Sequence, residues 1–165
     1  MILSCGEALI DMLPRTSTDG EACFAPYAGG AVFNTAIALG RLGAPSAFFS
    51  GVSNDMLGEI LADTLTASKV DTQYLARSDR PTTVAFVKLV NGQATYAFYD
   101  EATAGRMLST ADLPVLPASV STLFLGGISL VVSKSFSGDP NPALDLITVM
   151  KKAEAKEVNA SSEQE

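Results

Sequence analysis

The chain has 165 residues, of which 47% are hydrophobic and 18% charged, enough apolar sequence for one domain with a buried core. Its net charge of -7 argues against nucleic acid or an anionic membrane as partner, because both attract clustered lysines and arginines. The sequence has no histidine, which excludes Ser-His-Asp and Cys-His catalysis and every histidine-containing metal site.

The cysteines and the N-terminal sequence indicate the cellular compartment. Cys5 and Cys23 are the only cysteines and form no CxxC pair. The N-terminal sequence has neither a basic leader nor a cleavage pattern, so we expect two reduced, buried thiols rather than a disulfide. No run of 18 apolar residues exists, which predicts no membrane span. We therefore expect a cytoplasmic protein with no membrane partner.

The first thirty residues predict short strands. Residues 1–5 are typical of a strand of a buried parallel sheet. An apolar run at residues 8–13 contains Asp11, and Pro14 is expected to break it. Residues 23–29 predict a second short strand, which a proline at position 26 would confine to a sheet edge.

Two helices with an intervening strand follow. The apolar spacing predicts a helix over residues 31–42, and Gly43 fits its left-handed C-terminal cap. Residues 46–52 predict a second buried strand, and the segment Ser53-Asn54-Asp55 is expected to cap the next helix. That helix has one apolar face, made of Leu57, Ile60, Leu61 and Leu65. Strand alternating with helix predicts an α/β fold with parallel strands.

The second half of the chain no longer alternates strands with helices. Two β-rich runs, 81–90 and 93–100, flank Asn91-Gly92, a strong hairpin signal that predicts an antiparallel flap. Residues 109–118 predict a capped helical turn, and residues 121–132 predict another buried strand. Residues 133–165 predict a loop, one amphipathic helix and a disordered end.

The pair Gly29-Gly30 directly precedes the helix that contains Asn34. A helix N-terminus offers unpaired amide groups, and the two glycines allow a ligand close to the backbone. Asn34 supplies a donor and an acceptor, and Asp11 supplies acceptors from a strand end, a combination that suits a polyhydroxylated ligand. The alternative is a tight turn with a locally satisfied amide. No GxxxxGK[ST] or GxGxxG motif indicates a nucleotide site.

Several of these segments occur in an order known from one family. GEALIDMLP, AGGAVFNTAIALGRLGAPSAFFSGVSND, GEILADTLTASKVDT and TTVAFVKLVNGQATYAFYDEATAGRML span most of residues 1–132. Over this range the chain resembles the PfkB, or ribokinase-like, sugar kinases, and within them the bacterial fructokinases. The resemblance implies a parallel sheet with flanking helices plus a small antiparallel β lid, with lid strands at about 12–28 and 82–99. Residues 133–165 would form a divergent tail.

The resemblance also implies a substrate, cofactors and binding residues. Family members phosphorylate a sugar or nucleoside hydroxyl with ATP and Mg2+, and their sugar site lies between the α/β domain and the lid. Asp11 and Asn34 would bond sugar hydroxyls, and Gly29 and Gly30 would let the sugar approach the backbone. Phe98 would be the lid aromatic that covers the sugar, with Tyr96 as the other candidate. The alternative for both is packing within the lid sheet. Arg106 would lie near the substrate, and its alternative is a solvated arginine at a helix end.

The family pattern is matched in its N-terminal half only. The sequence contains no GAGD motif, whose aspartate is the family's general base, and the ATP and magnesium elements are not recognisable. We therefore expect no catalytic residue and no metal site here, and no activity from this chain alone. The alternatives are a non-catalytic sugar-binding or dimerising fragment, with a homodimer through the lid, and a degraded enzyme. Fructose is the expected sugar, with ribose, 2-keto-3-deoxygluconate and a nucleoside left open.

Overall fold

The computed structural model describes residues 1–91 and 93–126, so the predicted tail and the predicted strand beyond residue 126 lie outside the described residues. The elements in chain order are β1 (Ile2–Cys5), β2 (Leu9–Thr16), β3 (Ala22–Gly29), α1 (Ala31–Arg41), β4 (Ser46–Phe49), β5 (Gly51–Ser53), α2 (Met56–Ala67), β6 (Ala76–Ser78), β7 (Val84–Val90), β8 (Gln93–Tyr99), the 3-10 turn η1 (Thr110–Asp112) and β9 (Thr122–Leu125).

Parallel strands build one half of the molecule. β4, β1 and β9 form a three-stranded parallel sheet in that order, and β5 pairs in parallel with β6. These five strands and the two helices are called the α/β body below. The single strand predicted over residues 46–52 is wrong, because the chain leaves the β4 ladder at Ser50 and β5 pairs with a different strand.

The two helices cover the body, and both ends of α1 and the start of α2 were predicted closely. α1 ends at Arg41, and Gly43 has the expected positive φ of 83°. The Asp55 side chain caps α2 as predicted. One core packs α1 and α2 against the strands, with two central aromatic rings edge to face at 5.5 Å. Its fully buried members include Ile10, Phe33, Phe48, Leu61 and Leu65.

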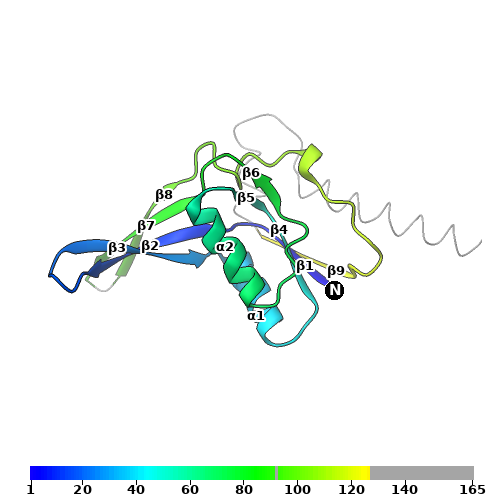
Figure 1. Ribbon diagram of the computed structural model, residues 1–165, viewed down its shortest axis with the longest axis horizontal. Coiled ribbons are helices and arrows are strands. Elements are labelled where there is room, and N and C mark those ends of the chain that lie inside the picture. Colours follow the sequence, from blue (N-terminus) through cyan, green and yellow to red (C-terminus); the bar gives the residue numbers. More distant parts are fainter. Residues whose placement is uncertain (92, 127–165) are drawn as a thin grey trace, which may run out of the picture.

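The remaining strands form a four-stranded sheet in the order β3-β2-β7-β8, which extends from the body on the left of Figure 1. The predicted hairpin is confirmed, since β7 and β8 pair antiparallel from Val84↔Tyr99 to Val90↔Gln93. The two antiparallel pairs are joined by a parallel pair, β2 with β7, which the sequence did not predict. Pro26 lies in edge strand β3 as expected.

Pro14 does not interrupt β2, so the predicted break is wrong. The parallel register with β7 runs only from Ile10 to Met12. Pro14 lies beyond this ladder and pairs only with Phe24 of β3, where one missing N–H is tolerated.

The two cysteines have different environments, and only one matches the prediction. Both thiols are free, but only Cys5 is buried. The expectation that Cys23 is buried is wrong, because it lies on an edge strand near the β2–β3 turn. The predicted capped turn is confirmed as η1, with Ser109 in a capping box. Within the part of the chain that the structure describes, no helix combines the length and apolar character needed to cross a membrane.

Candidate functional site

Asp11 and Gly29 lie in direct contact where β2 and β3 reach the body. A Cβ atom built on Gly29 would lie 2.4 Å from Oδ2 of Asp11, well inside van der Waals contact. A side chain at position 29 would therefore require the Asp11 carboxylate to move. Asp11 is half-buried, and burial raises the pKa of its carboxyl above the ordinary value of 3.8.

Gly30 forms the turn between β3 and α1. Its φ of 115° is a conformation that residues with a Cβ rarely adopt. A Cβ there would also lie 2.6 Å from the Glu7 carbonyl oxygen. Two separate constraints, a close backbone approach and a positive φ, thus account for glycine at this position.

Glu7 was not predicted and occupies the N-terminus of α1. Its Oε1 accepts hydrogen bonds from the backbone amides of Ala31 at 3.0 Å and Val32 at 3.3 Å. The side chain is buried, and Oε2 has no partner among the described residues. The expectation of unpaired amides at this helix end is therefore wrong for these two residues. The only signal was an acidic residue in the GEALID segment just after the first strand.

A row of paired residues crosses the four-stranded sheet at Asp11. The register places Tyr27, Asp11, Ala85 and Phe98 side by side on β3, β2, β7 and β8. Directly paired residues present their side chains to the same face of a sheet. Asp11 therefore shares a face with Phe98 and with Tyr27, a residue that the sequence did not single out.

The two aromatic candidates of β8 form a stacked pair on that face. Tyr96 and Phe98 have ring centroids 5.9 Å apart and planes inclined by 21°. Their exposed fractions are 54% and 55%, so neither ring is buried in the sheet. Phe98 belongs to the Asp11 row and Tyr96 lies one pleat further along β8, which puts Phe98 nearer to the carboxylate.

Asn34 and Arg106 have different surroundings. Asn34 is exposed in the first turn of α1, where its backbone N–H donates to the Gly30 carbonyl at 2.9 Å. Arg106 donates from Nη1 to the Asp100 carboxylate at 2.5 Å. The structure therefore places Asp11 against Gly29 and places Asn34 in the helical turn that starts at Gly30, whereas the guanidinium of Arg106 contacts Asp100.

Carboxylates already occupy the N-termini of both helices. The first amides of α1 donate to Glu7, and those of α2 donate to Asp55 at 3.0 and 2.7 Å. These amides are therefore not available to an anionic ligand. The described residues contain no group of three or more His, Cys, Asp or Glu side chains able to hold a metal ion.

This arrangement belongs to a known class of proteins. Residues 1–161 match the model of the pfkB family of carbohydrate kinases, and the chain is a member of that family. It is 68% identical over 133 residues to the fructokinase of Rhizobium leguminosarum bv. trifolii, which covers 81% of this chain and 41% of that protein. The chain thus spans less than half the length of this relative.

Solved structures agree with the family assignment. The structure of Xylella fastidiosa fructokinase with bound ATP matches with a TM-score of 0.73 at 30% identity, covering 93% of this chain and 48% of that one. The apo fructokinase of Vibrio cholerae O395 matches with a TM-score of 0.73 at 28% identity, covering 92% and 50%. The ribokinase-like α/β fold predicted from the sequence is therefore confirmed.

Proposed function

We propose that this chain supplies the sugar-binding part of an ATP-dependent carbohydrate kinase, with Asp11 and Asn34 bonding sugar hydroxyls beside Gly29 and Gly30. The observation that supports this most directly is the contact of the Asp11 carboxylate with Gly29, where no side chain stands between the carboxylate and the backbone. A carboxylate has acceptor sites for two hydroxyl groups. The four-stranded sheet would act as the lid, with Phe98 over the sugar.

Fructose is the proposed sugar, and ATP with Mg2+ the proposed phosphoryl donor. The support for fructose is the 68% identity to a rhizobial fructokinase, and the support for ATP is its presence in the similar Xylella enzyme. Arg106 is a weaker candidate for substrate contact because its guanidinium is paired with Asp100. We further propose a cytoplasmic location, as expected of a sugar kinase.

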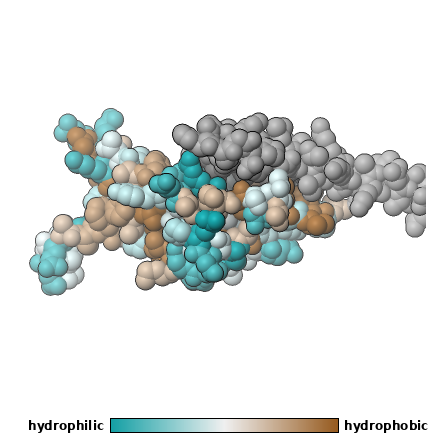
Figure 2. All heavy atoms as spheres, turned by 90° about the horizontal axis from the view of Figure 1, so that it is seen from above, coloured by the Kyte–Doolittle hydropathy of each residue, from teal (hydrophilic) through white to brown (hydrophobic). Residues whose placement is uncertain are grey.

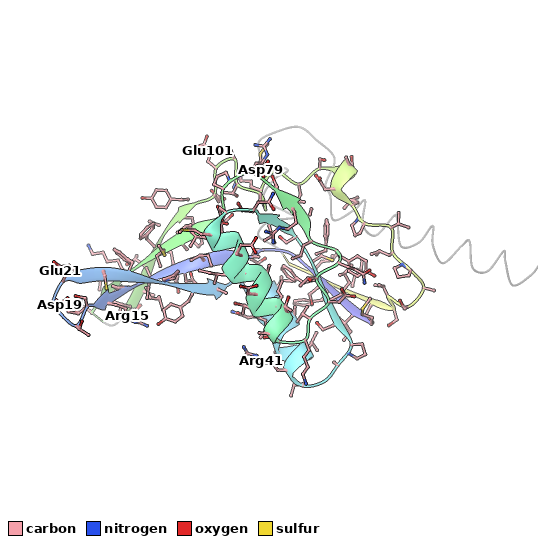
Figure 3. The ribbon with its side chains drawn as sticks, viewed as in Figure 1. Arg15, Asp19, Glu21, Arg41, Asp79 and Glu101 are labelled. Carbon is pink, nitrogen blue, oxygen red and sulfur yellow. The ribbon has the colours of Figure 1, made fainter. Side chains whose placement is uncertain are left out.

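The test of the proposed function is fructose binding by isothermal titration calorimetry. Asp11→Asn keeps the shape of the side chain but removes the negative charge and one acceptor, so we expect at least about tenfold weaker binding. Asp19→Asn is the matched control, because Asp19 lies at the far tip of the four-stranded sheet in Figure 3. Equal affinities for wild type and Asp11→Asn would contradict the role of Asp11.

Phosphoryl transfer needs a separate assay. A coupled assay with fructose, ATP and Mg2+ shows whether the 165-residue chain turns over, and ribose and 2-keto-3-deoxygluconate serve as competing substrates. Binding of fructose without turnover would support a sugar-binding part without activity of its own. Binding of another sugar in place of fructose would correct the proposed substrate.

A second candidate function, dimerisation through the four-stranded sheet, rests on its exposed apolar surface. Figure 2 shows hydrophobic residues over much of this end of the molecule. A groove of about 610 Å³ lies there. Its lining residues are Pro14, Phe24, Phe86, Val87, Lys88, Leu89, Thr95, Tyr96 and Ala97. Most of these side chains belong to the face opposite Asp11, so a partner there leaves the proposed sugar site open.

We propose a second copy of this chain as the partner on this surface. Phe24, which is 49% exposed, lines the groove on the face opposite Asp11, and a lysine there adds a charge to the apolar surface. We expect Phe24→Lys to convert a dimer to a monomer in size-exclusion chromatography with light scattering. Val115→Lys is the control, since Val115 is 93% exposed and outside this sheet. A wild-type monomer at high concentration would contradict the proposal.

A further inference from the structure

Two chain segments that join the body to the four-stranded sheet lie side by side. Residues 79–83 lead from β6 into β7, and residues 100–104 lead out of β8. The Ala104 amide donates to the Pro81 carbonyl at 3.0 Å, and the Thr83 hydroxyl donates to that of Thr103 at 2.8 Å. Figure 3 labels one residue of each segment, Asp79 and Glu101, close together in that view.

Asp55 fastens this pair of segments to the body. Its Oδ1 caps α2, accepting from the amides of Leu57 and Gly58, and also accepts from the Thr82 hydroxyl at 2.6 Å. Its Oδ2 accepts from the Thr82 amide at 2.9 Å. A helix cap needs only one oxygen, so the second oxygen serves the segment that enters β7.

The bonds continue from Thr82 toward the candidate sugar site. The next residue, Thr83, accepts a hydrogen bond at its carbonyl from the Ile10 amide at 2.9 Å. Ile10 precedes Asp11, which pairs in register with Ala85 of β7. Thr82 and Thr103 are only 7% and 2% exposed, so water does not readily replace these bonds.

We propose that Asp55 is a positioning residue that clamps the base of the four-stranded sheet, holding Asp11 and Phe98 in register over the Gly29-Gly30 turn. The inference rests on the proposed sugar-binding function, because its consequence for the protein is the geometry of that site. When the clamp opens, only part of the population keeps the binding geometry, and the apparent affinity falls by that fraction.

The decisive variant is Asp55→Asn. Asparagine caps helices as well as aspartate, so α2 keeps its cap. Its amide nitrogen replaces Oδ2 and cannot accept from the Thr82 amide, which leaves two donors facing each other. Asp63→Asn is the matched control, because it makes the same charge change at an exposed position of α2. Thr82→Val is a second, independent variant that removes only the hydroxyl bond to Oδ1.

The readouts are the fructose dissociation constant and amide hydrogen exchange by mass spectrometry. We expect Asp55→Asn to raise the dissociation constant about three- to tenfold. We also expect faster exchange in β7 and β8, unchanged exchange in α1 and β1, and a smaller effect in the same direction for Thr82→Val. If Asp55 had a purely structural role, Asp55→Asn would lower the melting temperature and leave the fructose affinity of the folded protein unchanged.

The possible outcomes separate this proposal from the proposed function. If the wild-type chain binds no sugar, the proposed function fails, while exchange in β7 and β8 still reports on the clamp. Selective acceleration there in Asp55→Asn, absent from Asp63→Asn, supports the clamp. Unchanged exchange in those strands, or acceleration spread equally over the body, overturns it.

Discussion

At the scale of single residues, the two cysteines have opposite environments. Cys5 lies in β1 with its side chain buried, and burial raises the pKa of its thiol to about 12. Cys23 is exposed on edge strand β3. We expect the folded chain to react with one equivalent of a thiol reagent such as DTNB at about pH 8 and with two equivalents after unfolding. Two fast equivalents from the folded chain would contradict the burial of Cys5.

The proposed role of Asp11 predicts that sugar binding depends on pH. Burial raises the pKa of its carboxyl above 3.8, and only the ionised form presents two negatively charged acceptor oxygens to the sugar hydroxyls. Fructose affinity should therefore be full at neutral pH and fall as the pH drops through this raised pKa. Because the pKa of Asp11 is higher in the folded chain than in the unfolded chain, ionising Asp11 lowers the free energy of unfolding. This loss of stability develops as the pH rises above 3.8 through the raised pKa.

Two measurements test the titration of Asp11. Calorimetric titrations between about pH 4 and 8 should give a falling acid limb for the wild type and a flat profile for the weaker Asp11→Asn variant. Urea unfolding at neutral pH should find Asp11→Asn at least as stable as the wild type, because no charge is then buried. A wild-type affinity that is constant over this range would exclude Asp11 as the titrating acceptor.

At the scale of elements, the contact between β5 and the segment after β8 is too close for a side chain. A Cβ on Gly51 would lie 2.1 Å from the Ala104 carbonyl oxygen, which belongs to the backbone and cannot rotate away. We expect Gly51→Ala to lower the free energy of unfolding by about 1–3 kcal/mol in urea titrations. At Gly105, across the same contact, an added Cβ would have no neighbour closer than 3.6 Å, so Gly105→Ala should change the free energy of unfolding by less than about 0.5 kcal/mol. Equal losses would contradict this geometry.

At the scale of the whole molecule, a bound sugar should stabilise the body and the four-stranded sheet together, because the proposed site takes residues from both. Fructose at about 100 times its dissociation constant adds about 2.7 kcal/mol. Each kcal/mol raises the melting temperature of a chain this size by roughly 2–4 °C. Scanning calorimetry should show one transition that the same fructose concentration raises in the wild type and raises by about half as much or less in Asp11→Asn, because a tenfold weaker site leaves about 1.4 kcal/mol of stabilisation. A rise of equal size in both would place the sugar elsewhere.

The sequence by itself determined the features that depend on neighbouring residues. Apolar spacing located α1 and α2, Asp55 and Gly43 marked helix ends, and Asn91-Gly92 marked the hairpin. These signals work because helix periodicity, capping and positive φ are requirements of a few consecutive residues. Gly30 was selected from the sequence for the close approach of a ligand, and the structure adds a positive φ of 115° at this residue.

Only the tertiary structure decided the contacts between distant segments. The parallel pairing of β2 with β7, the Glu7 carboxylate on α1 and the Asp55–Thr82 bonds join residues that are far apart in the chain. Pro14 was wrongly predicted to break β2, because a proline is tolerated in this strand only beyond the point where the hydrogen bonds to β7 end. Register between strands is set by packing over the whole domain, so no local pattern specifies which side chains meet. The candidate residues were therefore readable from the sequence, and their joint geometry was not.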